Sequence, residues 1–287
     1  MLVTLNLIGT HAKPLAVITG AGGGTGQAVA RRLGARYRLV IAARRDTAVK
    51  SLEEALTAEG YDVALAATAD VADPGSVRAL AEAAAAEGAI GAVVHTAGVS
   101  PALADWRTIL HVNLRGTAYV LDAFLPLAQA GTAVVNVASS SAYTLPTTAE
   151  VDAVLDDPYA EDLESRLEPL LRELDEHKTE QSFATRVYGA SKKGVIRLVE
   201  RRVGDWSAKG ARLLSVSPGA VVTPMLRKEI ELNPLAVRAA DITPMRRFGL
   251  PVDLAAAIDF LTSDQAGYIT GCDLRVDGGI VAARIHS

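Results

Sequence analysis

Short apolar segments alternate with helical segments along most of the chain, and this alternation limits the possible folds more than any other feature. The apolar segments are rich in β-branched residues, end in glycine or polar residues, and are too short for helices. They are residues 15–20, 38–44, 62–71, 90–98, 132–140, 211–219 and 272–279. The segments of helical character are 25–35, 46–59, 75–87, 103–129, 189–208 and 251–262. Strands that alternate with helices form βαβ units, which predicts an α/β fold with a mainly parallel sheet and helices on both faces.

One acidic segment breaks this alternation, between the fifth strand and the helix that follows it. Residues 144–184 carry leucines at helical spacing, namely Leu163, Leu167, Leu170, Leu171 and Leu174. Asp157 and Pro158 suit an N-cap followed by a first-turn proline, and Pro169 is expected to split the segment into two helices. We interpret residues 144–184 as a helical insertion in a single domain of residues 14–287, which a short extension of residues 1–13 precedes.

Composition argues against several other classes of protein. The net charge is −4 and no basic stripe is present, so nucleic acid is not an expected partner. No apolar run approaches the length that spans a bilayer, and the N-terminus does not resemble a signal peptide. The single cysteine, Cys272, cannot form an internal disulfide, and the five scattered histidines show no metal-ligand spacing. We therefore expect a cytoplasmic protein without membrane contact and without a metal site.

Five glycines fall within residues 20–26, between the first strand and the first helix. Glycine at this point lets backbone N–H groups and the start of a helix approach a pyrophosphate closely. The G-x-G-x-x-G pattern does not fit, but T-G-x-x-x-G-x-G does, as Thr19, Gly20, Gly24 and Gly26. A merely flexible turn is the alternative, and the position directly after the first strand favours a dinucleotide site.

The residues that follow the second strand bear on the choice of dinucleotide. An acidic side chain there would bind the adenosine ribose of NAD(H) and repel the 2′-phosphate of NADP(H). This chain has Ala43 at that position, followed by Arg44 and Arg45, and guanidinium groups suit a phosphate. We therefore prefer NADP(H), with NAD(H) as the alternative. The two arginines would otherwise be solvated at a helix start, with Asp46 as its N-cap or as an off-register ribose ligand.

Tyr188 and Lys192 are four residues apart at the start of a predicted helix. Residues at this spacing share a helix face. An ammonium group close to a phenol favours the phenolate, so Lys192 is expected to lower the pKa of Tyr188 toward the range of a useful acid or base. The pair is weak evidence by itself and gains weight from the motifs around it.

Taken together, these motifs resemble the short-chain dehydrogenase/reductase family. T-G-x-x-x-G-x-G is that family's cofactor loop, and the segment HTAG at residues 95–98 stands where the family usually has N-N-A-G. Ala97 and Gly98 match, whereas His95 and Thr96 depart from the family's asparagines. The resemblance extends over residues 14–281 except the insertion. It implies a Rossmann-type doubly wound parallel sheet of about seven strands.

The resemblance also implies a set of residues that bind the nicotinamide dinucleotide. Asp70 would contact the adenine, the Val221 backbone the carboxamide, and Thr223 the amide or a phosphate. Without the resemblance, Asp70 is a capping or loop residue and the Pro218–Gly219 pair an ordinary turn. The full set is Thr19, Gly20, Gly24, Thr25, Gly26, Arg44, Arg45, Asp70, Val71, Ala97, Gly98, Tyr188, Lys192, Pro218, Gly219, Val221 and Thr223.

A catalytic tetrad of Asn113, Ser139, Tyr188 and Lys192 is implied in the same way. Ser139 matches the family's serine after the fifth strand, and Ser140 is the alternative because three serines are consecutive. In reduction, Tyr188 would donate a proton to the substrate oxygen and Ser139 would hold that oxygen. Lys192 would tune Tyr188 and hold the nicotinamide ribose, and Asn113 would support a water relay.

The implied activity is that of an NAD(P)-dependent oxidoreductase that interconverts a ketone and a secondary alcohol. The insertion before Tyr188 resembles that of bacterial 3α-hydroxysteroid dehydrogenase/carbonyl reductases. We expect the insertion and residues 225–242 to wall the pocket, and their apolar content favours a hydrophobic, steroid-like or xenobiotic substrate. A 3-oxoacyl-type ketoreductase and a catalytically silent cofactor-binding sensor or scaffold are the alternatives. Because family members are commonly oligomers, a homotetramer or homodimer is expected.

Overall fold

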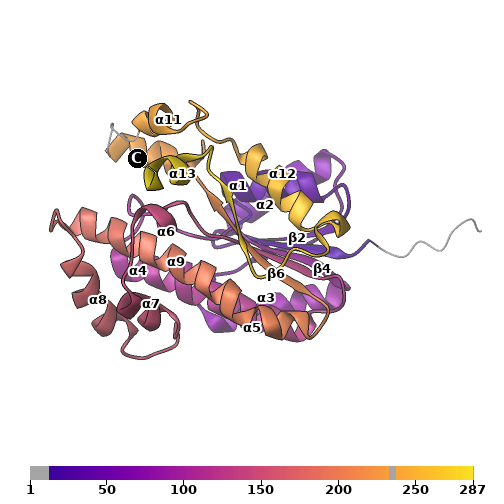
Figure 1. Ribbon diagram of the computed structural model, residues 1–287. Coiled ribbons are helices and arrows are strands. Elements are labelled where there is room, and N and C mark those ends of the chain that lie inside the picture. The colour runs from indigo at the N-terminus through magenta and orange to yellow at the C-terminus, as the bar shows by residue number, and fades with distance from the viewer. Residues whose placement is uncertain (1–12, 233–236, 287) are drawn as a thin grey trace, which may run out of the picture.

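The computed structural model describes residues 13–232 and 237–286. Its centre is a seven-stranded sheet in which neighbouring strands are parallel, in the order β3-β2-β1-β4-β5-β6-β7 (Figure 1). The strands are β1 (Leu15–Thr19), β2 (Arg38–Ala43), β3 (Val63–Thr68), β4 (Ile90–His95), β5 (Ala133–Val137), β6 (Arg212–Pro218) and β7 (Asp273–Val276). The predicted doubly wound sheet is therefore confirmed.

The predicted strands run past the carboxyl ends of the observed ones. The third, for example, was expected over residues 62–71, whereas β3 ends at Thr68. Several of the extra residues, such as Ala69, Val71 and Ala138, are apolar and buried like the strand residues, but they leave the ladder and form the loops at the carboxyl edge. The sequence pattern cannot separate these residues from the strands, because they are buried in the same way.

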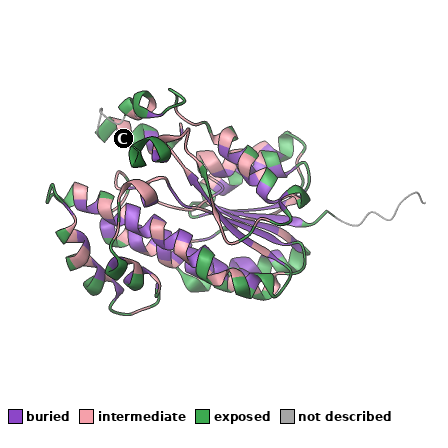
Figure 2. Cartoon of the chain, in the orientation of Figure 1, coloured by how far each residue is buried: buried purple, intermediate pink, exposed green. Residues whose placement is uncertain are grey.

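Helices cover both faces of the sheet (Figure 1). One face carries α1 (Gly24–Leu33), α2 (Asp46–Ala58) and α12 (Pro251–Leu261). The other carries α3 (Pro74–Glu87), α4 (Trp106–Leu110), α5 (Gly116–Phe124) and α9 (Glu180–Ser207). Successive strand residues belong to opposite cores: Val17 packs into the α9 side and Ile18 into the α1 side. Both faces are covered, which is why the five inner strands read as continuous apolar runs and are buried almost throughout, whereas the edge strands β3 and β7 are only partly buried (Figure 2).

The remaining helices are short or irregular. They are the π-helix η1 (His111–Arg115), the 3₁₀ helices η2 (Leu125–Leu127) and η4 (Asp264–Ala266), and α6 (Ser141–Thr144), α7 (Ala149–Leu155), α8 (Leu163–Glu173), α10 (Pro224–Leu232), α11 (Ala239–Ile242) and α13 (Ile280–Ile285). The single helix predicted over residues 103–129 is thus four consecutive pieces, α4, η1, α5 and η2. Its π-helical turn contains Asn113.

The insertion contains helices α7 and α8, but their limits differ from the predicted ones. Asp157 and Pro158 lie in a turn, and α8 begins only at Leu163, after Asp162. Pro169 lies inside α8 instead of separating two helices. Because proline has no N–H, the helix loses one backbone hydrogen bond there. Pro169 is exposed, and the buried leucines on the opposite side keep the helix packed against the core.

Helix α8 is part of the main core. Leu163, Leu167 and Leu171 are completely buried in the same cluster as Trp106 and Phe183, whose rings meet edge to face with centroids 5.5 Å apart. Ion pairs attach the other helix of the insertion, α7, to α9. Arg197 of α9 binds Asp156 at 2.7 Å and Asp152 at 3.2 Å, which fixes the end of α7.

Helix α9 begins at Glu180, well before the predicted start at residue 189. Thr179 caps it by accepting a hydrogen bond from the Ser182 backbone N–H at 3.1 Å, while the Ser182 hydroxyl accepts from the Thr179 N–H. Tyr188 therefore lies in the third turn of a long helix and not at its start. An interior turn is held by hydrogen bonds on both sides, so the side chains of Tyr188 and Lys192 have fixed directions.

Candidate active site

A cavity of about 650 Å³ opens at the carboxyl edge of the sheet. Its walls include the loops that follow β1 and β4, which are neighbours in the sheet. The chain builds β2 and β3 on one side of β1 and the later strands on the other, so the direction of strand addition reverses between β1 and β4. Ligands of open α/β sheets bind at such a reversal, because the adjacent loops diverge there.

The glycine turn lies against the loop after β4 with no space for side chains. Gly20 has φ of +68°, and a Cβ atom built there would lie 2.5 Å from the backbone nitrogen of Ala97. A Cβ on Gly26 would lie 2.5 Å from the carbonyl oxygen of Gly20. No side chain caps the start of α1, so its first N–H groups are left for a ligand. The turn therefore fits the pyrophosphate of the predicted dinucleotide.

Arg44 and Arg45 line the cavity beyond this turn and are exposed. Neither forms an ion pair with any part of the chain that the structure describes. Arg45 is itself the N-cap residue of α2, and Asp46 pairs with Lys50 at 2.9 Å. The predicted N-cap role of Asp46 is therefore wrong, and Asp46 does not belong to the cavity lining. Across the cavity mouth, the Asp70 carboxylate accepts the Ala72 N–H at 2.9 Å and shapes the turn after β3.

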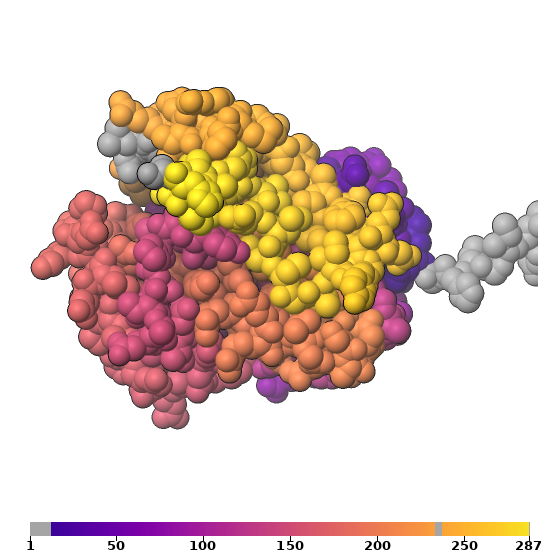
Figure 3. Space-filling model, in the orientation of Figure 1, coloured from indigo at the N-terminus to yellow at the C-terminus, as the bar shows by residue number. Residues whose placement is uncertain are grey.

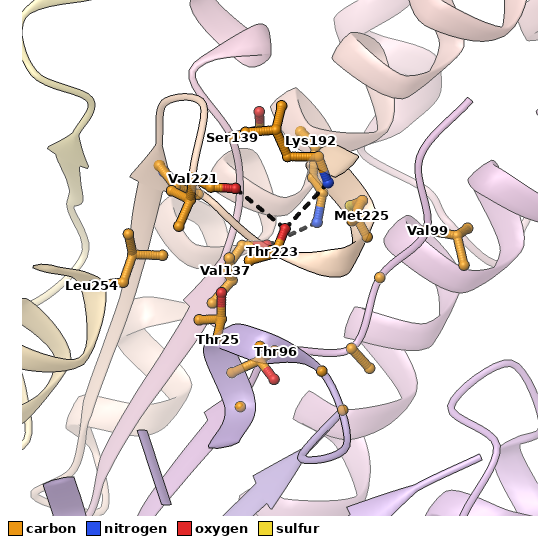
Figure 4. Close-up of a pocket in the computed structure, with 18 of the residues that line it drawn as sticks. Thr25, Thr96, Val99, Val137, Ser139, Lys192, Val221, Thr223, Met225 and Leu254 are labelled. Carbon is orange, nitrogen blue, oxygen red and sulfur yellow. Dashed lines mark hydrogen bonds between the residues drawn. The ribbon is translucent and has the colours of Figure 1, made fainter. Parts of the chain in front are cut away.

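Ser139, Tyr188 and Lys192 converge on the same cavity from the end of β5 and from α9. Figure 4 shows Ser139 and Lys192 together on one wall, with Thr25 and Thr96 on the opposite one. The Lys192 ammonium donates to the Val137 carbonyl at 2.8 Å. The Ser139 hydroxyl accepts the Ser141 N–H at 3.1 Å. It also contacts the phenol of Tyr188 and lowers the pKa of that phenol. This contact favours Ser139 over Ser140 as the serine that faces Tyr188.

Burial dominates the protonation of these groups. It lowers the pKa of Lys192 to about 8. It raises the pKa of Tyr188 to about 12, with a smaller increase from the charge of Glu229 and a decrease from Ser139. The sequence analysis predicted a lowered pKa for Tyr188, and that prediction is wrong for the chain alone. The phenol is desolvated and the ammonium group is directed to the Val137 carbonyl, so burial outweighs the nearby charge.

Two predicted residues lie behind the wall of the cavity. The Asn113 side chain forms hydrogen bonds with both backbone groups of Val99: it accepts the N–H at 2.9 Å and donates to the carbonyl at 3.0 Å. A Cβ on Gly98 would lie 3.1 Å from the Asn113 oxygen and 3.3 Å from the Lys192 nitrogen, so these two side chains approach each other across Gly98. Thr19 is buried and its hydroxyl is 2.7 Å from Nδ1 of His95.

The other predicted cofactor residues, including Val71, line the cavity as a group. Pro218 ends β6, and Gly219, Val221 and Thr223 belong to the loop after it. The Thr223 hydroxyl donates to the Val221 carbonyl at 3.2 Å. A Cβ on Gly24 would lie 3.2 Å from the Thr223 methyl group, so this loop closes over the glycine turn (Figure 4).

The prediction that the insertion walls the substrate part of the cavity is wrong. Of residues 144–184 only Thr144 lines the cavity, because the two helices of the insertion pack against α4 and α9 instead. Figure 3 shows the insertion at the lower left of the surface, away from the orange segment at the top that follows β6. Residues of 225–242 do form a wall, apart from 233–236, which lie outside the described residues. From the predicted ranges, the cavity is lined by Thr144, Met225, Leu226, Glu229, Ala239 and Ile242. Lining residues outside the predicted site residues and wall segments include Val99, Leu103, Val112, Leu254, Ile280 and Arg284.

Residues 13–232 and 237–286 contain neither a membrane-spanning helix nor a cluster of metal-binding side chains. No helix there combines the length and the apolar character needed to cross a membrane. No group of three or more histidine, cysteine, aspartate and glutamate side chains there is arranged to hold a metal ion.

Comparisons with known proteins agree with this geometry. The family model described as short chain dehydrogenase matches residues 14–149. A second model, described as enoyl-(acyl carrier protein) reductase, matches residues 176–281. The matched ranges contain the glycine turn, the end of β5, and the helix that carries Tyr188 and Lys192.

Individual relatives are similar over most of their length. Galactitol 2-dehydrogenase (L-tagatose-forming) of Cereibacter sphaeroides is 32% identical over 273 residues, 92% of this chain and 93% of the relative. The 3-alpha-hydroxysteroid dehydrogenase/carbonyl reductase of Comamonas testosteroni is 31% identical over 192 residues, 66% of this chain and 72% of the relative. The solved RhlG/NADP active-site complex of Pseudomonas aeruginosa has a TM-score of 0.71 at 25% identity, and the match covers 94% of this chain and 97% of that one.

Proposed function

Because the chain belongs to the short-chain dehydrogenase/reductase family, we propose that Ser139, Tyr188 and Lys192 catalyse its reaction in the cavity beside the glycine turn. The family consists of oxidoreductases that act on alcohols and ketones with NAD(P) cofactors, and this chain is an enzyme of that kind. The observation that supports the assignment is the convergence of these three side chains on one cavity with the predicted dinucleotide residues.

A bound nicotinamide dinucleotide supplies or accepts the hydride. In reduction, Tyr188 donates its proton to the substrate oxygen, for which a phenol that is protonated at neutral pH is suited. Ser139 donates a hydrogen bond to the same oxygen and stabilises the negative charge that develops on it. In oxidation the two residues act in the reverse order, with Tyr188 taking the proton of the alcohol.

Between turnovers, Lys192 returns a proton to Tyr188. Its ammonium is held by the Val137 carbonyl and is buried, so its pKa of about 8 lets it exchange protons near neutral pH. Lys192 would also hold the hydroxyls of the nicotinamide ribose. Asn113 does not face the cavity, and its role is to fix Val99 and Gly98 beside Lys192 and so to support a water relay that returns protons to the lysine.

NADP(H) is the proposed cofactor. Arg44 and Arg45 lie in the wall of the cavity without carboxylate partners among the described residues, so both guanidinium groups remain available for a 2′-phosphate. Ala43 offers no acidic side chain to the ribose of NAD(H). The similarity to a protein solved with NADP agrees with this choice.

The proposed substrate is a hydrophobic ketone or secondary alcohol. Val99, Leu103, Met225, Leu226 and Ile242 supply apolar surface around the place where a substrate would lie. The relatives are named for both polyol and steroid substrates, so their names leave the substrate class open. The cytoplasmic location and the homotetrameric or homodimeric state stay predictions.

Replacement of Tyr188 with phenylalanine tests the catalytic assignment. We expect turnover of a reducible ketone with NADPH to fall by at least about 100-fold, because the proton donor is lost. NADPH binding, followed by fluorescence titration, should remain measurable in the same variant.

Tyr119→Phe is the matched control, because Tyr119 stacks on Tyr159 away from the cavity and should leave turnover unchanged. Full turnover by Tyr188→Phe would contradict the assignment. A wild-type protein that binds NADPH but reduces no ketone in a broad panel would instead favour a catalytically silent sensor or scaffold.

A further inference from the structure

One carboxylate interrupts the apolar wall of the substrate part of the cavity. Glu229, in α10, lines the cavity and is half-buried. The same cavity is lined by the apolar residues Val99, Leu103, Met225, Leu226 and Ile242. A carboxylate among such residues loses hydration, and burial accordingly raises the pKa of Glu229. The free-energy cost of desolvating a carboxylate in this way is expected where the carboxylate binds a ligand.

Glu229 lines the same cavity as Ser139, Tyr188 and Lys192. Its charge raises the pKa of the Tyr188 phenol, so the carboxylate lies within electrostatic reach of the proton donor. Within residues 13–232 and 237–286, no arginine or lysine pairs with it, and the ion pair of the same helix joins Lys228 to Glu231. Among the other charged side chains of the lining, Lys192 donates to Val137, and Arg44, Arg45 and Asp70 lie with the dinucleotide residues, while Arg284 is exposed on α13.

Ser100 lies behind Glu229 and not in the wall of the cavity. It is completely buried directly after Val99, and its hydroxyl lowers the pKa of Glu229. The Ser100 oxygen has no other partner in good hydrogen-bond geometry among the described residues, so its hydroxyl is left to support the Glu229 carboxylate. Because Glu229 lines the cavity and has no cationic partner among the described residues, its carboxylate keeps acceptor capacity toward the cavity.

A hydroxyl group fits this capacity better than an ammonium group. A hydroxyl has a single hydrogen, which it donates to the carboxylate, and its lone pairs need no partner from the apolar wall. An ammonium group has three hydrogens to satisfy, and the surrounding wall of Val99, Leu103 and Leu226 offers no further side-chain acceptors. It would also have to lose its hydration on entry, which a single half-buried carboxylate compensates poorly.

We propose that Glu229 selects substrates that carry a second hydroxyl group close to the reacting carbon. The substrate class is then a hydrophobic hydroxy ketone in reduction and the corresponding diol in oxidation. Tyr188 and Ser139 hold the oxygen that changes oxidation state, and Glu229, supported by Ser100, holds the one that does not. This inference rests on the proposed function, because Tyr188 defines where the reacting carbon lies.

Matched ketones test the proposal with NADPH as the reductant. The ratio of kcat/KM for 2-hydroxycyclohexanone to that for cyclohexanone should be about 10 to 100 in the wild type, as for a charge-assisted hydrogen bond. Glu229→Leu removes both acceptor oxygens and should bring the ratio close to 1. Glu229→Gln keeps the size and one acceptor, so it should give an intermediate ratio.

Glu231→Gln is the matched control, because Glu231 is exposed two residues further along the same helix and should leave the wild-type ratio unchanged. A wild-type enzyme that reduces cyclohexanone with a ratio near 1 overturns this inference alone. This inference is also overturned if protonated 2-aminocyclohexanone is preferred over the hydroxy ketone and Glu229→Gln abolishes that preference. The carboxylate would then select substrates by their positive charge. If the wild type binds NADPH but reduces none of the ketones, the proposed function fails and this inference with it.

Discussion

His95 shows how a single side chain adopts an environment that its sequence neighbours do not reveal. It ends β4, its Nδ1 lies 2.7 Å from the Thr19 hydroxyl, and its other ring nitrogen has no partner among the described residues. Burial, with a smaller effect from the Lys192 charge, lowers the pKa of His95 to about 3. The imidazole is therefore neutral in the folded protein at every pH at which an enzyme of this kind is assayed.

Stability should accordingly fall in mild acid. Below the unfolded-state pKa of about 6.5, the unfolded chain binds a proton at His95 that the folded chain refuses until about pH 3. Between pH 7 and pH 5 this linkage removes about 2 kcal/mol from the free energy of unfolding. His95→Asn should abolish that part of the loss. Urea unfolding of both proteins at the two pH values measures it.

The comparison uses the change with pH and not the absolute stability, so it holds even if His95→Asn is less stable at pH 7. His177→Asn, at an exposed position, serves as the control for loss of an imidazole and should keep the wild-type change. Equal losses in wild type and His95→Asn would show that the buried imidazole does not resist protonation.

At the scale of elements, the leucine spacing of residues 163–174 predicted a helix, and α8 is present over most of that range. What the spacing did not show is which surface the helix covers. Leu163, Leu167 and Leu171 join the core formed by α4 and α9, so the insertion supports the helix that carries Tyr188 and Lys192 instead of closing the cavity.

Leu167→Ala should therefore destabilise the protein without changing its active site. The side chain is completely buried, and its loss leaves a cavity that costs about 2–5 kcal/mol. Chemical unfolding measures the loss, and the KM for NADPH at a temperature well below unfolding should stay the same. Leu170→Ala, at a half-buried position of the same helix, should cost clearly less. A changed KM for NADPH in Leu167→Ala would mean that α8 acts on the cavity after all.

At the scale of the whole molecule, the cavity draws its walls from loops after β1, β2, β3, β4, β5 and β6. A dinucleotide bound there would connect both halves of the sheet and would stabilise the folded state by mass action. The arginines after β2 decide how much of this stabilisation depends on the 2′-phosphate.

NADPH should raise the unfolding temperature more than NADH at equal concentration, as measured by differential scanning fluorimetry. At 100 times its Kd, a ligand adds about 2.7 kcal/mol to the free energy of unfolding. The double variant Arg44→Ala and Arg45→Ala should lose the difference between NADPH and NADH, because its phosphate contacts are gone. Lys50→Ala, which removes an exposed cation from the same helix, should retain it. An advantage of NADH in the wild type would refute the proposed cofactor.

The sequence by itself determined the layers of the fold and which loops surround the cavity. Apolar runs and glycine patterns are local, and parallel strands place their carboxyl ends at one edge, so Gly20, Ser139 and Pro218 meet there whatever the details of packing. The same reasoning extended the strands too far, placed Tyr188 at a helix start and misplaced the insertion helices. Those limits depend on caps and on burial against distant segments, as at Thr179 and Leu163.

Only the tertiary structure decided the protonation and the partners of the site residues. Desolvation depends on atoms from the whole chain, so the raised pKa of Tyr188 and the lowered pKa of His95 have no local signal. Glu229 and Ser100 are far apart in sequence, and nothing near either residue indicates that the Ser100 hydroxyl acts on the Glu229 carboxylate. That contact is a property of packing and not of sequence pattern.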